Sequence, residues 1–128
     1  AIAARLEDAD SGVRRVAVEA LGRLGEHAAP HAGAIAARLE DTDSDVRWVA
    51  VEVLGGLGEH AAPHAGAIAA RLEHVNGGVR RTAVKALGVL GEHAAPHAGA
   101  IAARLENADS GVRQVAMEAL CRLGEHAA

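Results

Sequence analysis

The sequence predicts an all-α fold, a right-handed α-solenoid in which four helical hairpins stack into a superhelix. The unit GEHAAPHAGAIAARLE, which runs from Gly25 to Glu40, recurs unchanged from Gly58 and again from Gly91, so the chain is built of repeats. Apolar residues within each unit follow helical spacing. Half of the hydrophobic residues are alanine, and Trp48 is the one aromatic residue. This composition favours close packing of thin layers over a single large core.

The four copies of the AIAARLE segment begin 33 residues apart, at Ala1, Ala34, Ala67 and Ala100. We interpret residues 1–128 as a single repeat domain with four units, at residues 1–33, 34–66, 67–99 and 100–128. The first and last units are incomplete, which is typical of a fragment of a longer array. A hairpin of this length cannot bury its apolar face alone, so neighbouring hairpins must stack.

The first helix of each unit is predicted over a stretch such as residues 30–40. Its apolar residues Ile35, Ala36 and Leu39 fall at helical spacing. Pro30 lies in the first turn, where a proline costs no hydrogen bond. With the shortened copy at the start of the chain, the four units predict eight helices.

The second helix of each unit begins after a polar residue that can accept hydrogen bonds from its free amides. These predicted N-caps are Asp10, Asp43, Asn76 and Asp109. Six apolar residues then follow one helical face without a break, namely Val13, Val16, Ala17, Ala20, Leu21 and Leu24. A glycine ends each of these helices, at Gly25, Gly58, Gly91 and Gly124.

Three glycines lie inside the second helices, at Gly22, Gly55 and Gly88. Each costs about 1 kcal/mol of helix propensity relative to alanine. We expect a neighbouring helix or a partner to approach the backbone closely at these positions.

The composition argues against several classes of function. Thirteen basic and 17 acidic residues give a formal net charge of −4, which offers no basic field for nucleic acid. Charged residues interrupt every apolar stretch, so neither a membrane span nor a signal peptide is predicted. The single cysteine, Cys121, excludes an intramolecular disulfide. No catalytic constellation or cofactor motif is found, so we expect no enzyme activity and no cofactor. The compartment stays open, with the cytoplasm mildly favoured.

Pairs of histidines recur in each unit within the pattern Glu-His-x-x-x-His. Two imidazoles four residues apart on a helix can share a metal ion, but Pro30 and its copies fall inside the interval. The main expectation is therefore loop histidines that cap helix ends and pack against the adjacent loop, with metal binding as the alternative. The candidates are His27, His31, His60, His64, His93 and His97.

The second helices differ between units mainly on one arc, and stacking places the differing residues side by side as a ridge. We predict that this ridge binds a protein or peptide partner, with Trp48 as an aromatic anchor flanked by Arg15 and Arg81. The alternatives are a solvated helix face, and an indole packed across Gly56 or Val49. The predicted partner-binding residues are Arg15, Glu19, Arg23, Trp48, Glu52, Arg81, Lys85, Gln114, Glu118 and Arg122.

The pattern D-x-D-S-x-V-R-x-x-A-V-E-x-L-G-x-L-G, from Asp41 to Gly58, resembles the HEAT-repeat family, whose solenoids are armadillo-like. It is most similar to the short HEAT-like repeats of phycobilisome lyase proteins. The resemblance covers the whole chain and implies that the second helices line a concave face. It also implies an alternative function, a lyase-like subunit that handles a bilin chromophore.

The same resemblance implies a ladder of hydrogen bonds between repeats, made by an Asp that follows the first helix and an Arg early in the second. The matching pairs are Asp8 with Arg14 and Asp41 with Arg47. His74 and Asn107 replace the aspartate in the third and fourth units, so we expect a weaker ladder there. The arginines concerned are Arg80 and Arg113.

Both end units carry the apolar residues of internal units, such as Ile2 and Leu6 at one end and Leu120 and Leu123 at the other. Solenoids normally close with polar terminal repeats. We therefore expect head-to-tail self-association. A self-assembling structural array with a histidine ladder is the remaining alternative for the function.

Overall fold

The computed structural model describes residues 2–107 and 109–127. The described residues form seven α-helices, joined by short 3-10 segments, and contain no strand. The helices are α1 (Ser11–Arg23), α2 (Ala32–Ala37), α3 (Ser44–Leu57), α4 (Ala65–Ala70), α5 (Gly77–Leu90), α6 (Ala98–Ala103) and α7 (Ser110–Ala127). The all-α solenoid predicted from the repeats is confirmed.

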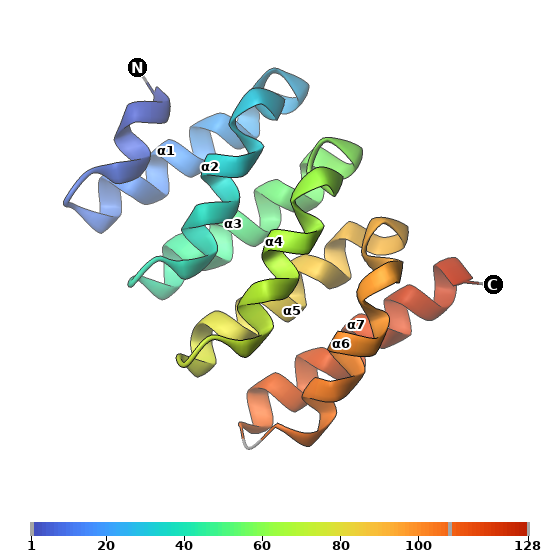
Figure 1. Ribbon diagram of the computed structural model, residues 1–128. Coiled ribbons are helices and arrows are strands. Elements are labelled where there is room, and N and C mark those ends of the chain that lie inside the picture. The colour runs from blue at the N-terminus through green and yellow to red at the C-terminus, as the bar shows by residue number, and fades with distance from the viewer. Residues whose placement is uncertain (1, 108, 128) are drawn as a thin grey trace.

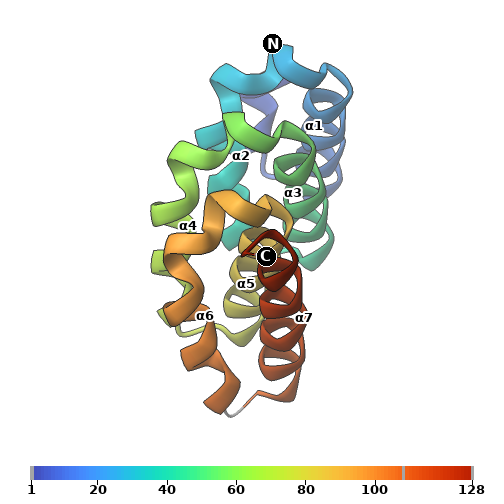
Figure 2. The same cartoon turned by 90° about the vertical axis from the view of Figure 1, so that its right-hand side faces the viewer.

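The helices form two stacked layers (Figure 1). The longer helices α1, α3, α5 and α7 make one layer and the short helices α2, α4 and α6 make the other, as the view from the side shows (Figure 2). Within the long layer, α3 packs between α1 and α5, and α5 packs between α3 and α7. The main contacts of each long helix are therefore with the long helices of the neighbouring repeats. No helix in the described part of the chain has the length and apolar character needed to cross a membrane.

Polar side chains begin the long helices as predicted. The carboxylate of Asp10 accepts hydrogen bonds from the main-chain N–H groups of Gly12 and Val13, and Asp43 does the same at the start of α3. Asn76 accepts from the N–H of Val79 at 3.1 Å. These bonds satisfy amides that have no partner within their own helix.

The first helices are shorter than predicted. Instead of one α-helix over residues 30–40, the structure has a 3-10 segment at Gly25–His31, the six residues of α2, and a second 3-10 segment at Arg38–Glu40. Pro30 lies inside the first segment and has no N–H to donate, so regular α-helix starts only after it. The first unit has no α-helix at all in this place, because Ile2–Glu7 is 3-10 throughout. The predicted count of eight α-helices was wrong for this reason.

Three of the four predicted glycine stops are confirmed. Gly25, Gly58 and Gly91 have φ angles of 59°, 52° and 57°, a region that a side chain would strain. The prediction for Gly124 was wrong, because α7 continues through it to Ala127. Unlike the other three glycines, Gly124 does not have a positive φ angle, so the helical backbone continues through it.

The core lies between the layers and between successive long helices. Leu54 of α3, Ile35 of α2 and Leu87 of α5 are fully buried. The glycines inside the long helices bring the backbones close, as expected. A Cβ on Gly22 would lie 2.8 Å from a methyl group of Val53, so α3 approaches α1 closely here only because residue 22 is a glycine.

Candidate binding cleft on the long helices

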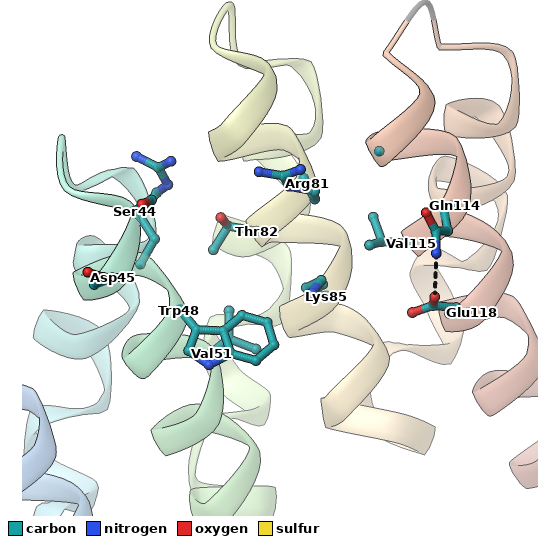
Figure 3. A pocket seen from close by; sticks show the side chains of 12 residues that line it. Ser44, Asp45, Trp48, Val51, Arg81, Thr82, Lys85, Gln114, Val115 and Glu118 are labelled. Atoms are coloured by element: carbon teal, nitrogen blue, oxygen red, sulfur yellow. Dashed lines mark hydrogen bonds between the residues drawn. The ribbon is translucent and has the colours of Figure 1, made fainter.

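A cleft of about 380 Å³ lies on the exposed side of α3, α5 and α7. Each of the three helices contributes side chains to its wall (Figure 3). Trp48 comes from α3, Arg81 and Lys85 from α5, and Gln114 and Glu118 from α7. All five are predicted ridge residues, and stacking of the repeats brings them together.

Trp48 is the aromatic wall of this cleft. Its side chain is 49% exposed, although it is the only aromatic residue of the chain. The ammonium group of Lys85 lies 4.1 Å from the centroid of the indole ring, a cation–π contact. No atom lies within 4 Å of the Cβ position of Gly56, so the indole does not pack across that glycine. The ring remains available to a ligand.

Helix α5 contributes two basic side chains, Arg81 and Lys85, to the cleft. Arg81 and Lys85 lie one turn apart, and neither forms an ion pair with the carboxylates of the described residues. A Cβ on Gly111 would lie 3.0 Å from Nη1 of Arg81, so the guanidinium rests against the first turn of α7. Opposite this pair, Gln114 Nε2 lies 3.5 Å from a carboxylate oxygen of Glu118.

The floor of the cleft is apolar and fixed. Val51 and Val115 are buried beneath it. Thr82 is also buried, and its hydroxyl donates a 2.7 Å hydrogen bond to the main-chain oxygen of Gly78. A second cleft of about 220 Å³ shares Trp48 and Lys85 with the first and continues toward Arg122 on α7. Together the two clefts form a continuous groove.

The predicted ridge residues of α1 lie outside this groove, whereas Glu52 and Arg122 line its second part. Arg15 and Glu19 form an exposed ion pair at 3.5 Å on α1. Glu19 and Arg23 line a separate cleft between α1 and α3, together with Glu52. The ridge residues of α1 and those around Trp48 therefore line different clefts, and Glu52 lines both.

The predicted partner-binding residues leave out seven residues that line the main cleft, namely Ser44, Asp45, Arg47, Val51, Thr82, Gly111 and Val115. Arg47 was assigned only to the ladder between repeats. Asp45 and Thr82 differ from their copies in the other units, which are glycine and valine, and this difference was a usable signal.

The ladder between repeats has a different register from the one expected. The guanidinium of Arg14 donates two hydrogen bonds, at 2.8 and 2.9 Å, to the carboxylate of Asp41 in the next unit, and not to that of Asp8. Within its own unit, Arg14 donates to the main-chain oxygen of Asp8 at 2.8 Å. Arg47 likewise donates to the main-chain oxygen of Asp41 at 2.7 Å and not to its carboxylate. The arginine side chain is long enough to reach both its own loop and the next.

The two later arginines also bond to their own loops. Arg80 donates to the main-chain oxygen of His74, and Arg113 to that of Asn107 at 2.7 Å. In the described chain the buried Nε of Arg80 has no hydrogen-bond partner. In the register that Arg14 shows, His74 and Asn107 stand where Arg47 and Arg80 would meet a carboxylate of the next unit, so the prediction named Arg113 in place of Arg47.

The six candidate histidines all lie in 3-10 segments between a long and a short helix. The expectation that they cap helix ends was wrong for His31, His64 and His97, whose side chains make no cap hydrogen bond at α2, α4 and α6. Their φ angles lie between −98° and −104° and their ψ angles between 0° and 7°, which is not the extended backbone that is usual at an N-cap. His64 packs against the first turn of α2 and not against a loop, because its Cε1 lies 3.1 Å from the position that a Cβ on Gly33 would occupy. Among the described residues, no group of three or more His, Cys, Asp or Glu side chains could hold a metal ion.

No protein-family model matches the chain, and no curated protein sequence matches it. Three of the similar solved structures are designed or engineered proteins. One engineered protein has a TM-score of 0.65 at 20% identity and covers 97% of this chain and 61% of its own. A second has a TM-score of 0.63 at 19% identity and covers 96% of this chain and 36% of its own.

A designed armadillo repeat protein in complex with the peptide (KR)4 is also similar. Its TM-score is 0.61 at 18% identity, and the match covers 95% of this chain and 62% of the designed protein. The chain therefore spans less than two thirds of each of these structures. At these identities the similarity shows the fold alone, a solenoid of helical repeats like that of the designed armadillo repeat protein. The likeness to phycobilisome-lyase repeats remains a resemblance of sequence.

Proposed function

We propose that this chain is a non-catalytic binding scaffold that holds an extended segment of a protein or peptide along α3, α5 and α7. The observation that carries the proposal is the exposure of Trp48 in a cleft to which three successive long helices contribute. Aromatic and arginine side chains in such clefts dominate the energetics of interfaces. The designed armadillo repeat protein of similar fold binds a peptide, which supports the same use of a stacked-helix surface.

The side chains of the cleft favour a ligand that is acidic and apolar. Arg81 and Lys85 supply two positive charges one turn apart, and Trp48 and Val51 supply apolar surface beside them. A carboxylate can bind between the cations while a neighbouring apolar side chain covers the indole. The peptide bound by the designed protein is basic. The acidic lining residues Asp45 and Glu118 are outnumbered by three basic ones, so the cleft carries a net positive charge that disfavours such a peptide.

Calorimetric titration tests the proposal with two matched peptides of eight residues, one alternating Glu and Leu and the other alternating Lys and Leu. We expect the Glu–Leu peptide to bind and the Lys–Leu peptide to bind at least tenfold more weakly, a difference of ~1.4 kcal/mol or more. Trp48→Ala and Arg81→Gln should each weaken binding of the Glu–Leu peptide by a similar factor, because each removes one of the two recognition elements.

Arg23→Gln is the matched control for this titration, because Arg23 lies on α1 outside the cleft and carries the same charge as Arg81. It should leave the affinity unchanged. All variants should keep the helicity and melting temperature of the unaltered chain. Equal affinity for the two peptides, or equal effects of Arg23→Gln and Arg81→Gln, would count against the proposed cleft. A large loss of stability in Trp48→Ala would show that the indole is structural.

A further inference from the structure

The cleft between α1 and α3 is opposite in charge to the main cleft. It measures about 410 Å³, and its charged lining residues are two carboxylates, Glu19 and Glu52, and one arginine, Arg23. The main cleft is lined by three basic residues and two acidic ones. We call the cleft between α1 and α3 the acidic cleft.

The acidic cleft is joined to the main cleft by the groove on the long helices. Glu52 lines both the acidic cleft and the second part of the groove, which also contains Trp48 and Lys85. Trp48 and Glu52 lie about one turn apart on α3. The apolar side chains of Val51 and Val89 line the same part of the groove. An extended ligand that contacts Trp48 can therefore continue toward α1 along one surface.

Glu52 is the carboxylate of the acidic cleft that has no cation of its own. Glu19 forms an ion pair with Arg15 at 3.5 Å, whereas Glu52 forms no ion pair with any of the described residues. The sequence also differs at this point. Glu19 and Glu118, which are copies of Glu52, are each followed one turn later by an arginine, whereas Glu52 is followed by Gly56. An arginine at that spacing can neutralise a glutamate on the same helix, and the second unit lacks it.

Gly56 leaves room beside Glu52 for a cation that comes from a ligand. No atom lies within 4 Å of the position that a Cβ on Gly56 would occupy. Both residues line the acidic cleft. The copies of Gly56 in the first and fourth units are Arg23 and Arg122. The structure thus combines a carboxylate without a counter-ion and an open space next to it, at a position where two other units carry a guanidinium.

We infer that the groove binds a segment that carries both charges, with an acidic side chain at Arg81 and Lys85 and a lysine or arginine side chain at Glu52, over Gly56. The inference rests on the proposed function and adds the spacing of the charges in the ligand. Neighbouring packed helices lie about 8–10 Å apart, which places the acidic cleft about 12–15 Å from α5. An extended chain advances about 3.3 Å per residue, so the two charged residues of the ligand are about four positions apart.

Calorimetric titration with three peptides tests the inference. One is the Glu–Leu peptide beginning with Glu, and in the other two either its first or its last Glu is replaced by Lys. Each lysine peptide keeps a Glu four positions from the Lys, and the pair covers both directions of the chain along the groove. We expect one of the two to bind more tightly than the Glu–Leu peptide by about threefold or more, because an ion pair replaces a repulsion at Glu52.

Two variants test where the lysine binds. Glu52→Gln should remove the increase in affinity, so that this lysine peptide binds no more tightly than the Glu–Leu peptide. Gly56→Arg should do the same, because a guanidinium of the chain itself then occupies the space beside Glu52. Arginine favours a helix more than glycine does, so the melting temperature of this variant should not fall. Glu59→Gln is the matched control, since it removes an exposed carboxylate that follows α3 and lines none of these clefts. It should keep the increase.

The same titrations separate this inference from the proposed function. If the Glu–Leu peptide binds and neither lysine peptide binds more tightly, the inference is overturned while the proposed function stands. An increase in affinity that persists in Glu52→Gln would also overturn the inference, because the lysine would then lie elsewhere. If none of the three peptides binds, both the inference and the proposed function are wrong.

Discussion

Leu54→Ala is expected to lower the free energy of unfolding by about 2–5 kcal/mol. Leu54 is 0% exposed on α3, the long helix that packs between α1 and α5. Removing its side chain leaves a cavity that well-packed neighbours on both sides cannot fill by local collapse. Because each unit is stabilised only by its neighbours, a loss in this unit weakens two junctions of the stack.

Leu24→Ala is the matched control for this measurement. It makes the same chemical change just after the end of a long helix, but Leu24 is 45% exposed. We expect it to cost less than about 1 kcal/mol, since much less apolar area is lost from the folded state. Urea denaturation followed by far-ultraviolet circular dichroism measures both values. An equal loss of unfolding free energy in the two variants would contradict the difference in burial between Leu54 and Leu24.

Asp41→Asn is expected to lower the free energy of unfolding by roughly 2–3 kcal/mol. The carboxylate is almost fully buried and accepts hydrogen bonds from Arg14 at 2.8 and 2.9 Å and from the N–H of Asp43 at 2.9 Å. Arg38 lies 3.4 Å away. Asparagine keeps the shape but removes the charge, so Arg14 remains at the junction without its counter-ion.

The same carboxylate should make stability depend on acid pH. Burial alone would raise the pKa of Asp41, but the hydrogen bonds from Arg14 and Asp43 and the charges of Arg14 and Arg38 outweigh it. The pKa in the folded state therefore lies below its ordinary value of 3.8. A depressed carboxyl pKa stabilises the fold above the unfolded-state pKa, and this contribution is lost as pH falls through the folded-state pKa.

Unfolding free energies measured from pH 7 down to about pH 2 test this prediction, with Glu52→Gln as a control that removes one exposed carboxylate. The unaltered chain and Glu52→Gln should lose stability in parallel below about pH 4. Asp41→Asn should show a shallower loss, because the titrating group is gone. Parallel profiles for all three proteins would mean that the Arg14–Asp41 junction contributes little.

Much of the fold was predictable because its determinants are local. The period of the repeats, the N-caps such as Asp10 and the turn glycines such as Gly25 each act within a few residues. The first helices were predicted too long because apolar spacing alone does not distinguish an α-helix from 3-10 turns after Pro30. Burial at the ends could not be read from the sequence of one unit. Val13 and Val46 occupy identical positions, yet only Val46 has a unit in front of it.

The residues of the candidate site could be predicted where they occupy the same position in successive repeats. Ordering the differing residues by unit placed Trp48, Arg81 and Gln114 side by side, and the structure puts them in one cleft. Whether a given set of equivalent residues lines a cleft depends on the side-chain volumes on the neighbouring helices. The spacing of residues within one helix carries no information about those volumes. The partner of Arg14 was missed for a related reason. Its side chain reaches the next unit, whereas the sequence pattern placed the aspartate in its own.

Nuclear magnetic resonance tests most directly whether a ligand binds on α3, α5 and α7 beside Trp48. Trp48 is the only tryptophan, so its indole N–H gives one assignable signal. Titration with the Glu–Leu peptide should shift this signal in step with the amides of Arg81, Lys85 and Glu118, all with one saturation curve. An unchanged indole signal, with shifts confined to α2, α4 and α6 on the other layer, would contradict the account.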